Sequence, residues 1–323
     1  MAHPDPVLVH DWHPVARATD VAPGKPVAAR LLGEDLVLWA ADGRYHAWQD
    51  LCIHRGAKLS LGKVTGGCLQ CPYHGWTYDE SGMCVKIPAH PDQKPPARAH
   101  TVVHRCREAY GWLWVCLSET PNELPVFPEW EADEVRSFAM GPYEMDAGGP
   151  RVIENFLDLA HLSVVHDGIL GIEGRGEIGR YTVEKRPEGV FASDIVVWQP
   201  DPDGSGQAAE AHYTYRVIRP LAAYLHKRAG TSVFTMMIVA TPVDEVRTRA
   251  WIAFTMKGAD SASDEQLIEW TDRVFLQDKP VVQSQRPELL PLDLQAELHL
   301  NCDRTSIAYR QWLNELGVSF GTS

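Results

Sequence analysis

The sequence predicts an α+β protein of two domains, an N-terminal all-β domain and a larger C-terminal domain in which helices flank an antiparallel sheet. Three observations lead to this prediction. Short β-rich runs separated by glycine-containing turns fill the N-terminal region, two amphipathic helical patterns enclose strand-like runs in the remainder, and a proline-rich stretch divides the two regions. Because each region has apolar faces of its own to bury, each is expected to form a separate core.

The N-terminal region has the pattern of consecutive hairpins. Residues 25–48, KPVAARLLGEDLVLWAADGRYHAW, alternate β-rich runs with turns that contain glycine, and YGWLWVCLS at 110–118 continues the pattern. The stretch TPNELPVFPEW then contains three prolines, which lack a backbone N–H donor and interrupt regular structure. We therefore predict a first domain over 1–125, with its core at about 26–118, and a second domain over 126–323.

The C-terminal region combines both kinds of periodicity. Residues 150–166, PRVIENFLDLAHLSVVH, repeat apolar residues at steps of three and four, which predicts one helix. Four strand-like runs follow: FASDIVVWQ, HYTYRVIR, SVFTMMIVA and RAWIAFTM. A second helix is predicted after Ser263, because Ser263 and Gln266 are spaced as a capping box before LIEWTDRVFLQ.

Composition and charge bear on the class of function. The chain has 323 residues, 45% hydrophobic and 23% charged, which is typical of a globular protein. Thirty basic and 43 acidic residues give a net charge of −13, spread along the chain, so no nucleic-acid surface is expected. No apolar run approaches the roughly 20 residues that span a bilayer, and no secretion signal is recognisable. We expect a cytoplasmic protein without a membrane or nucleic-acid partner.

Seven cysteines, an odd number gathered mostly in the first third of the chain, favour metal ligation over a disulfide framework. The segment DLCIHRGAKLSLGKVTGGCLQCPYHGW contains Cys52-x-His54 and, after sixteen intervening residues, Cys71-x2-His74. A two-iron cluster in which two histidines replace two of four cysteines has a raised reduction potential. A zinc site is the alternative, but zinc ligands usually come in like pairs, whereas each pair here mixes Cys with His.

This stretch resembles the Rieske motif C-x-H-R-G-(x)n-C-x2-H-G-W, and the resemblance identifies the first domain as a Rieske [2Fe–2S] domain. The residues that follow each ligand pair also match: Arg55, Gly56, Gly75 and Trp76. The resemblance implies that Cys52 and Cys71 hold one iron. His54 and His74 then hold the other. Cys68 lies close to the motif but outside it, so a structural role is expected for it and for the other four cysteines.

A second set of polar residues lies within the predicted helix 150–166. Asn155, Asp158 and His161 recur at steps of three and would form one ridge among apolar neighbours. His166 would lie about 140° away from His161 on an ideal helix, so both can reach one metal only if the helix ends, widens or bends between them. Two core histidines with hydrogen-bonded partners are the alternative.

The whole string resembles the N-x2-D-x2-H-x4-H signature of Rieske non-heme iron oxygenase catalytic subunits. The resemblance implies that His161 and His166, with one carboxylate, bind Fe(II) and leave positions open for O2 and substrate. It also implies catalytic roles for Asn155 and Asp158, and a helix-grip-like fold for the second domain. In a head-to-tail trimer, Asp158 would connect His161 with His74 of a neighbouring subunit and so carry the passage of electrons.

The carboxylate ligand must come from elsewhere in the chain, and Asp278 on the second predicted helix is the candidate. It shares a mostly apolar face with Ile268, Thr271, Phe275 and Val282. An acid there is costly to bury unless it is paired or bound to a metal, and FLQDKPVVQSQ resembles the corresponding family segment. Asp272, off that face, is the nearest rival, and an ion pair between Asp278 and Lys279 is the alternative. Pro280 is expected to distort the helix just past Asp278.

One motif is set aside. Gly174, Gly176 and Gly179 spell G-x-G-x-x-G, but they do not connect a strand to a helix, so we predict a mobile loop beside the active site. The sequence contains no convincing nicotinamide or flavin site. Electrons are therefore expected from NAD(P)H through a separate flavin/iron-sulfur reductase or a ferredoxin.

The chain length and the segment QRPELLPLDLQAELHLNCDRTSIAYRQWLNEL resemble the single-subunit members, such as vanillate and dicamba demethylases, toluenesulfonate monooxygenase and the saxitoxin-pathway hydroxylases. The resemblance implies a homotrimer without a β subunit. It also implies hydroxylation or oxidative demethylation of an aromatic or fused-ring small molecule, with one [2Fe–2S] cluster and one Fe(II) per chain. Arene cis-dihydroxylation is the runner-up, and a pure electron carrier is disfavoured because it would need no second metal set. The expected pocket wall comprises Phe156, Leu157, Ile169, Met236, Met237 and Trp251.

Overall fold

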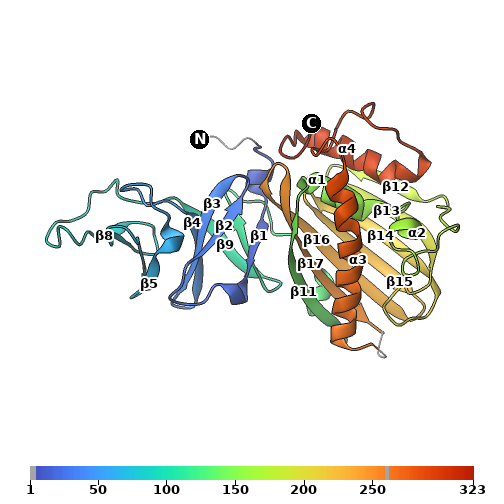
Figure 1. Cartoon of the computed structure of the whole chain (residues 1–323), viewed down its shortest axis with the longest axis horizontal. Coiled ribbons are helices and arrows are strands. Elements are labelled where there is room, and N and C mark those ends of the chain that lie inside the picture. The colour runs from blue at the N-terminus through green and yellow to red at the C-terminus, as the bar shows by residue number, and fades with distance from the viewer. Residues whose placement is uncertain (1–4, 259–261) are drawn as a thin grey trace. The chain divides into compact units, whose positions relative to one another are not determined.

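The computed structural model describes residues 5–258 and 262–323, and it divides into two compact units (Figure 1). The smaller unit is Val9–Leu124. The larger unit is Pro125–Ser323 together with the residues up to Leu8. Within the described ranges, no helix is both long enough and apolar enough to cross a membrane.

The smaller unit is all-β and contains two antiparallel sheets. The first has the strand order β1-β10-β9-β4-β3-β2, and its strands are β1 (His13–Arg17), β2 (Val27–Leu31), β3 (Glu34–Ala41), β4 (Arg44–Gln49), β9 (Val103–Ala109) and β10 (Trp112–Cys116). The second has the order β5-β6-β7-β8, and its strands are β5 (Lys63–Thr65), β6 (Cys68–Gln70), β7 (Thr77–Tyr78) and β8 (Cys84–Lys86). The predicted succession of short hairpins is confirmed.

Glycine closes the hairpins of the larger of these two sheets. Three two-residue turns, Leu32-Gly33, Asp42-Gly43 and Tyr110-Gly111, have positive φ at both positions. Two successive positive φ angles match the right-handed twist of the flanking strands, and glycine adopts them without steric cost. The X-Gly pairs therefore fix which strands become neighbours in the sheet.

The larger unit is built on one seven-stranded antiparallel sheet. The strand order is β11-β17-β16-β15-β14-β13-β12. The strands are β11 (Arg136–Met145), β12 (Thr182–Arg186), β13 (Gly189–Gln199), β14 (Ala209–Arg219), β15 (Ala222–Ala229), β16 (Ser232–Asp244) and β17 (Arg247–Lys257). The four strand-like runs of the sequence lie in β13, β14, β16 and β17, whereas β11, β12 and β15 were not predicted. The α+β fold class with an antiparallel sheet is confirmed.

The described residues of this unit form four α-helices: α1 (Gly149–Leu157), α2 (Leu162–Val165), α3 (Asp264–Ser284) and α4 (Arg304–Leu316). α1 contacts β15, β16 and β17, α3 contacts β11, and α4 contacts β12 and β13 (Figure 1). The predicted capping box starts α3, because the Ser263 hydroxyl accepts from the Gln266 N–H at 3.3 Å and the Gln266 amide oxygen accepts from the Ser263 N–H at 2.8 Å. Pro280 lies inside α3, and the helix continues beyond it to Ser284.

The prediction of one helix over residues 150–166 was wrong. α1 ends at Leu157, and Asp158 has an extended backbone with φ −78° and ψ 140°. The Asp158 carboxylate accepts the backbone N–H groups of Ala160 and His161, both at 3.1 Å, so a local side-chain turn replaces the helical hydrogen bonds. His161 then precedes the four-residue α2, and His166 follows it. Because His161 and His166 do not lie within one continuous helix, their side chains can point toward the same place.

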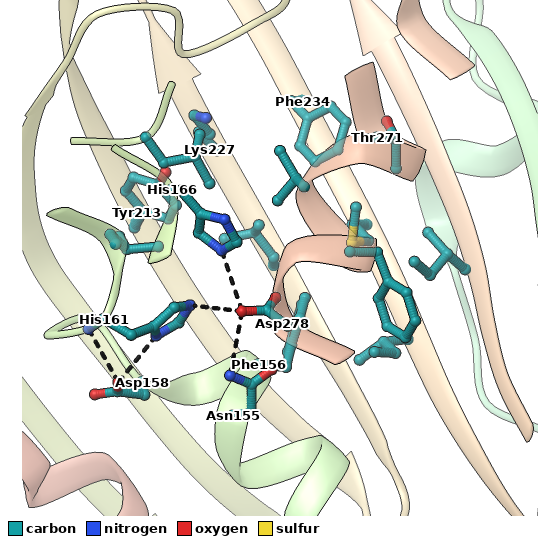
Figure 2. Close-up of a pocket in the computed structure, with 18 of the residues that line it drawn as sticks. Asn155, Phe156, Asp158, His161, His166, Tyr213, Lys227, Phe234, Thr271 and Asp278 are labelled. Carbon is teal, nitrogen blue, oxygen red and sulfur yellow. Dashed lines mark hydrogen bonds and ion pairs between the residues drawn. The ribbon is translucent and has the colours of Figure 1, made fainter. Parts of the chain in front are cut away.

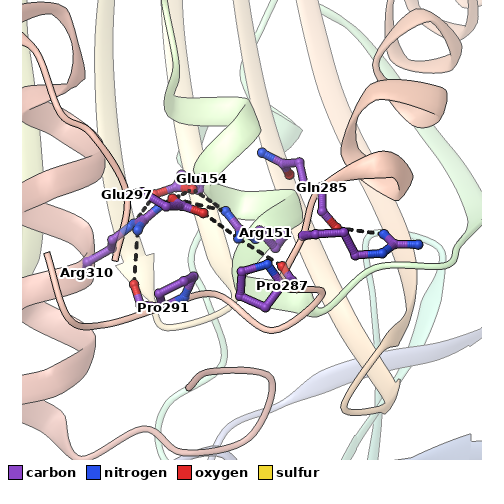
Figure 3. Close-up of polar contacts among 8 residues, drawn as sticks. Arg151, Glu154, Gln285, Pro287, Pro291, Glu297 and Arg310 are labelled. Carbon is purple, nitrogen blue, oxygen red and sulfur yellow. Dashed lines mark hydrogen bonds and ion pairs between the residues drawn. The ribbon is translucent and has the colours of Figure 1, made fainter. Parts of the chain in front are cut away.

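A buried charge network holds α1 against α4 (Figure 3). Arg310 of α4 pairs with both carboxylate oxygens of Glu154 of α1, at 2.6 and 2.9 Å. Glu297 contacts Arg310 and also Arg151 of α1, the latter at 2.7 Å. Arg151 donates a further bond to the carbonyl of Pro287 at 2.9 Å. Because every charge has an opposite partner, the network can stay buried while it fixes the helix that leads into the site.

Candidate active site

The first candidate site is formed by two loops of the smaller unit that have the same construction. In one, the N–H of Gly56 donates to the carbonyl of Cys52 at 2.9 Å; in the other, the N–H of Gly75 donates to the carbonyl of Cys71 at 3.2 Å. Both glycines have positive φ, +69° and +72°. A side chain at position 75 would also meet Pro88 at 3.0 Å. The glycine of each motif is therefore required by the turn that presents the ligands.

The two loops bring the two predicted thiol ligands together and the two predicted imidazole ligands together. Cys52 and Cys71 are buried on top of a core that includes Trp39, Trp48 and Tyr78, whereas the rings of His54 and His74 lie 4.5 Å apart, His74 exposed. The Tyr78 hydroxyl lies 3.1 Å from the Cys52 sulfur.

The donor chemistry of this site fits a Rieske cluster. Burial raises the pKa of the Cys71 thiol, so the thiolate form requires a cation beside it. The Nδ1 atom of His54 is buried and has no hydrogen-bond partner among the described residues, which leaves it available as a metal donor. Two buried thiols on one side and two imidazoles on the other match the ligand set of a [2Fe–2S] cluster with unequal irons.

The second candidate site is in the larger unit, where His161, His166 and Asp278 converge (Figure 2). One ligand atom of each lies within 4.8 Å of the others. The Asp278 Oδ1 atom is 3.5 Å from Nε2 of His161 and 3.3 Å from Nε2 of His166. α3 therefore supplies the carboxylate, and the segments beside α2 supply the two imidazoles.

Hydrogen bonds orient both imidazole rings toward this carboxylate. Nδ1 of His161 lies 2.9 Å from Asp158, and Nδ1 of His166 lies 2.9 Å from the amide oxygen of Gln277. Because both partners are acceptors, each Nδ1 carries the proton, and each Nε2 presents a lone pair to Asp278. Two lone pairs and a carboxylate converge favourably only around a cation. Two histidines and one carboxylate, oriented in this way, fit the facial set of a non-heme Fe(II) site.

The charges near His161 set its protonation preference. Burial lowers the pKa of His161, but the hydrogen bond that His161 donates to Asp158 and the charges of Asp278 and Asp158 outweigh burial, so the pKa is raised. Burial raises the pKa of Asp158, and the hydrogen bond with His161 and two backbone N–H groups outweigh it, so the pKa is lowered. Asp158 is thus held as a carboxylate, the form that accepts a hydrogen bond from Nδ1–H of His161.

The alternatives for the carboxylate find no support. Asp272 accepts a hydrogen bond from the Tyr143 hydroxyl, away from the histidines. The described residues contain no ion pair between Asp278 and Lys279, and the Asp278 side chain is nearly buried. Asn155 donates to Asp278 Oδ1 at 3.4 Å. Asn155 therefore positions the Asp278 carboxylate. The sequence motif included Asn155 but did not predict this contact.

A mostly apolar cavity of about 650 Å³, including some open solvent, adjoins these three residues. Aromatic and aliphatic side chains from α1, the sheet and α3 form most of its wall, among them Phe156, Tyr213, Tyr215, Phe234, Met236 and Ile252. The cavity can therefore exclude water from an aromatic ring held next to the three converging side chains.

The expected pocket wall was correct in part. Phe156 and Met236 line the cavity, whereas the described wall does not include Leu157, Ile169, Met237 or Trp251. Side chains alternate across a strand, so Met236 and Ile238 of β16 face the cavity and Met237 faces the opposite side. The same alternation separates Ile252 from Trp251 on β17. The sequence identified the strands but left the choice of face open.

Several residues of the site were missed. Gln277 is adjacent to Asp278 in the sequence, but its contact with His166 spans 111 positions. A polar residue on a predicted helix normally indicates a solvent-exposed position, so this contact was not expected. Tyr78 follows the second ligand pair by four positions and reaches back to Cys52. Lys227 also lines the cavity, although the alternation in β15 could have placed it on the buried face.

The glycine-rich segment has no βαβ context. Gly174, Gly176 and Gly179 lie in an irregular stretch between α2 and β12. A side chain at position 176 would meet the Ser163 hydroxyl at 2.4 Å, so this glycine allows the segment to pass close to α2. Its mobility stays a prediction.

Comparisons with known proteins show the family of the chain. The family "Rieske [2Fe-2S] domain" matches residues 11–103, and the "Vanillate O-demethylase oxygenase C-terminal domain" matches 145–318. Methylxanthine N1-demethylase NdmA of Pseudomonas putida is 35% identical, over 96% of this chain and 89% of that protein. The structure of NdmA with caffeine has a TM-score of 0.85 at 34% identity, covering 96% of this chain and 91% of that one. Dicamba monooxygenase bound to dicamba has a TM-score of 0.82 at 20% identity, over 96% and 97%, which shows the shared fold.

Proposed function

The chain belongs to the Rieske non-heme iron oxygenases, as a catalytic subunit of the single-subunit type, and on this premise we propose that it oxidatively demethylates an aromatic or fused-ring small molecule. The observation that carries the proposal is the aromatic-lined cavity that opens onto His161, His166 and Asp278. Methylxanthine N1-demethylase NdmA and methylxanthine N3-demethylase NdmB, 35% and 30% identical to this chain over most of its length, are N-demethylases by name, which favours demethylation over other oxygenations.

We propose the metal-binding roles from the donor groups of the two sites and, for the cluster, from the resemblance of its motif. Cys52, His54, Cys71 and His74 would hold the [2Fe–2S] cluster, which supplies one-electron transfer at a raised potential. The mononuclear Fe(II) would be held by the three residues that converge in the larger unit, His161, His166 and Asp278, and it supplies activation of O2. Asp158 and Gln277 would orient the imidazoles, and Asn155 would orient the carboxylate.

The proposed reaction balances as R–CH3 + O2 + NAD(P)H + H⁺ → R–H + HCHO + H2O + NAD(P)⁺, where the methyl group is attached to nitrogen or oxygen of R. One oxygen atom inserts into a C–H bond of the methyl group, and the resulting hydroxymethyl compound releases formaldehyde when its bond to the heteroatom breaks. The chain's own contribution is to hold the methyl group next to the metal ligands and to keep water away, which the apolar wall favours.

The electrons would come from NAD(P)H through a separate flavin/iron-sulfur reductase or a ferredoxin. We also propose a homotrimer in which the cluster of one subunit serves the iron of its neighbour through Asp158. A cytoplasmic location stays a prediction from the sequence.

The test is a product assay with the iron-loaded protein, a surrogate reductase and NADH. A panel of N- and O-methylated aromatics should yield formaldehyde together with one equivalent of the demethylated ring compound. A ring-hydroxylated product without formaldehyde would show that the reaction is hydroxylation and not demethylation. A cis-diol product would show that the reaction is dihydroxylation. Asp278→Ala serves as the matched control, because it should remove formaldehyde release without removing the cluster.

A further inference from the structure

One cationic side chain stands out in the wall of the apolar cavity. Lys227 of β15 lines the cavity and is only 3% exposed. The alternation of the strand directs it to the same face as Leu225, which also lines the cavity. In Figure 2 its ammonium group lies well apart from the Asp278 carboxylate, beyond His166.

The ammonium group has no close anionic partner. Its Nζ atom lies 5.3 Å from the ring centre of Tyr213 on β14 and 5.3 Å from that of Trp270 on α3. Among the described residues, its contacts are these two rings, with no hydrogen bond and no ion pair within 4 Å. The carboxylates of Asp203 and Asp201 act on it only at longer range.

This arrangement leaves the charge of Lys227 incompletely compensated. Burial lowers the pKa of Lys227 to about 7, although Asp203 and Asp201 raise it. The faces of Tyr213 and Trp270 attract a cation, but they do not replace the hydrogen bonds that three ammonium protons would make in water. Buried charges in proteins are normally paired, so a lone one that faces an open cavity is suited to a partner that arrives with the ligand.

We propose that Lys227 is a specificity-determining residue that binds an anionic oxygen of the substrate, so that the substrate is a methylated aromatic acid held with its methyl group toward His161, His166 and Asp278. The identity of the reacting methyl group rests on the proposed function. The anionic oxygen can belong to a carboxylate or to an ionised ring oxygen, and both would accept the ammonium protons in the same way. Tyr213 and Trp270 hold the ammonium group in place until it is paired.

The structural alternative is that Lys227 only joins the sheet to α3 through Tyr213 and Trp270. Truncating the side chain would then weaken the binding of every ligand alike. If Lys227 instead pairs with a negative charge on the ligand, truncation weakens the binding of anionic ligands alone. The discriminating quantity is therefore the ratio of Kd values for an anion and a neutral compound with the same ring system.

The experiment measures binding to the oxidised, iron-loaded protein without a reductase, so that no turnover occurs. The probes are 4-methoxybenzoate against 4-methoxybenzamide, and a monomethylurate anion against caffeine. We expect wild type to prefer the anion at least tenfold in one pair, and Lys227→Met to lose that preference while the neutral probe binds within about threefold of wild type. Lys227→Arg should keep the preference. A preference in the benzoate pair would identify a carboxylate as the anionic group that Lys227 binds, and a preference in the urate pair would identify an ionised ring oxygen.

Absence of a charge preference in wild type for both pairs, including failure of all probes to bind, would overturn the proposal, and so would equal losses for both members of a pair in Lys227→Met. Iron content and the melting temperature report whether the variant folds, and Lys227→Gln replaces it if it does not. Formaldehyde release separates this proposal from the proposed function. Demethylation without charge preference overturns only the role of Lys227, whereas charge-selective binding without formaldehyde from any probe overturns only demethylation.

Discussion

The amide oxygen of Gln277 lies 2.9 Å from Nδ1 of His166, although the two residues are 111 positions apart in the chain. Gln277 is adjacent to Asp278, so α3 both supplies the predicted carboxylate and orients one of the two predicted imidazoles. A residue with this role should control how tightly the metal is held.

Gln277→Leu is expected to lower the affinity for Fe(II) about 10–100-fold, because the His166 ring loses the acceptor that fixes its tautomer and direction. Titration of the metal-depleted protein with Fe(II) under anaerobic conditions measures this change. Gln277→Glu, which keeps an acceptor at the same position, is the matched variant and should retain most of the affinity. Equal affinities in wild type and Gln277→Leu would contradict an orienting role.

Asp278→Ala tests the carboxylate ligand. The iron content should fall from about three to about two per chain, with activity lost and the visible spectrum of the cluster unchanged. Asp272→Ala is the control on the same helix, because Asp272 bonds Tyr143 and not the histidines. If Asp278→Ala keeps its full complement of iron, the ligand must be another carboxylate.

The cluster assignment is tested by a pair of serine substitutions in neighbouring positions. Cys71→Ser should abolish the visible absorption and the EPR signal of the reduced protein, because a buried thiolate ligand is lost. Cys68→Ser should leave both intact, since Cys68 lies on β6 outside the two ligand loops. Identical spectra for the two variants would show that the ligands are wrongly assigned.

A feature could be predicted from the sequence when it depends on neighbouring residues, and it could not when it depends on contacts between distant parts of the chain. The two metal motifs, the capping box at Ser263 and the amphipathic face of Asp278 are local patterns, so each could be identified before the structure. β12 was missed because this exposed strand carries charged side chains in place of an alternating apolar pattern.

Tertiary contacts account for the other differences. Asp158 ends α1 by capturing two backbone N–H groups, and helical periodicity cannot show such competition. Gln277 and Lys227 gain their roles only where α3 and the sheet face the cavity. Their neighbours along the chain do not reveal those contacts.

Asp158→Asn tests whether this residue mediates electron transfer from the cluster of one subunit to the iron of its neighbour. The substitution keeps the size of the side chain but removes its charge and half of its acceptor capacity. We expect normal iron content, a reducible cluster, a trimer that still forms, and turnover reduced about 100-fold or more. Rapid mixing of the reduced protein with O2 and substrate measures cluster reoxidation. Reoxidation at the wild-type rate in a fully metallated variant would rule out the bridging role, and loss of iron would indicate a structural one.

The network that holds α1 against α4 makes a prediction about stability. Arg310 is 3% exposed and bonds both carboxylate oxygens of Glu154, so Arg310→Met leaves Glu154 buried with only Arg151 nearby, at 3.6 Å. Removing one partner of a buried ion pair costs about 3–5 kcal/mol of unfolding free energy. Urea unfolding of the holoprotein, followed by tryptophan fluorescence, measures the loss.

A double-mutant cycle separates this pair from general damage to the helix contact. In Arg310→Met with Glu154→Gln, no uncompensated charge remains at position 154, so the double variant should be less destabilised than the sum of the single variants by about 1–3 kcal/mol. Strict additivity would mean that the two side chains stabilise α1 independently. The iron content of Arg310→Met is informative as well, because Asn155 follows Glu154 directly and bonds Asp278. We expect iron to be lost at lower urea concentrations than those that unfold the cluster-bearing unit.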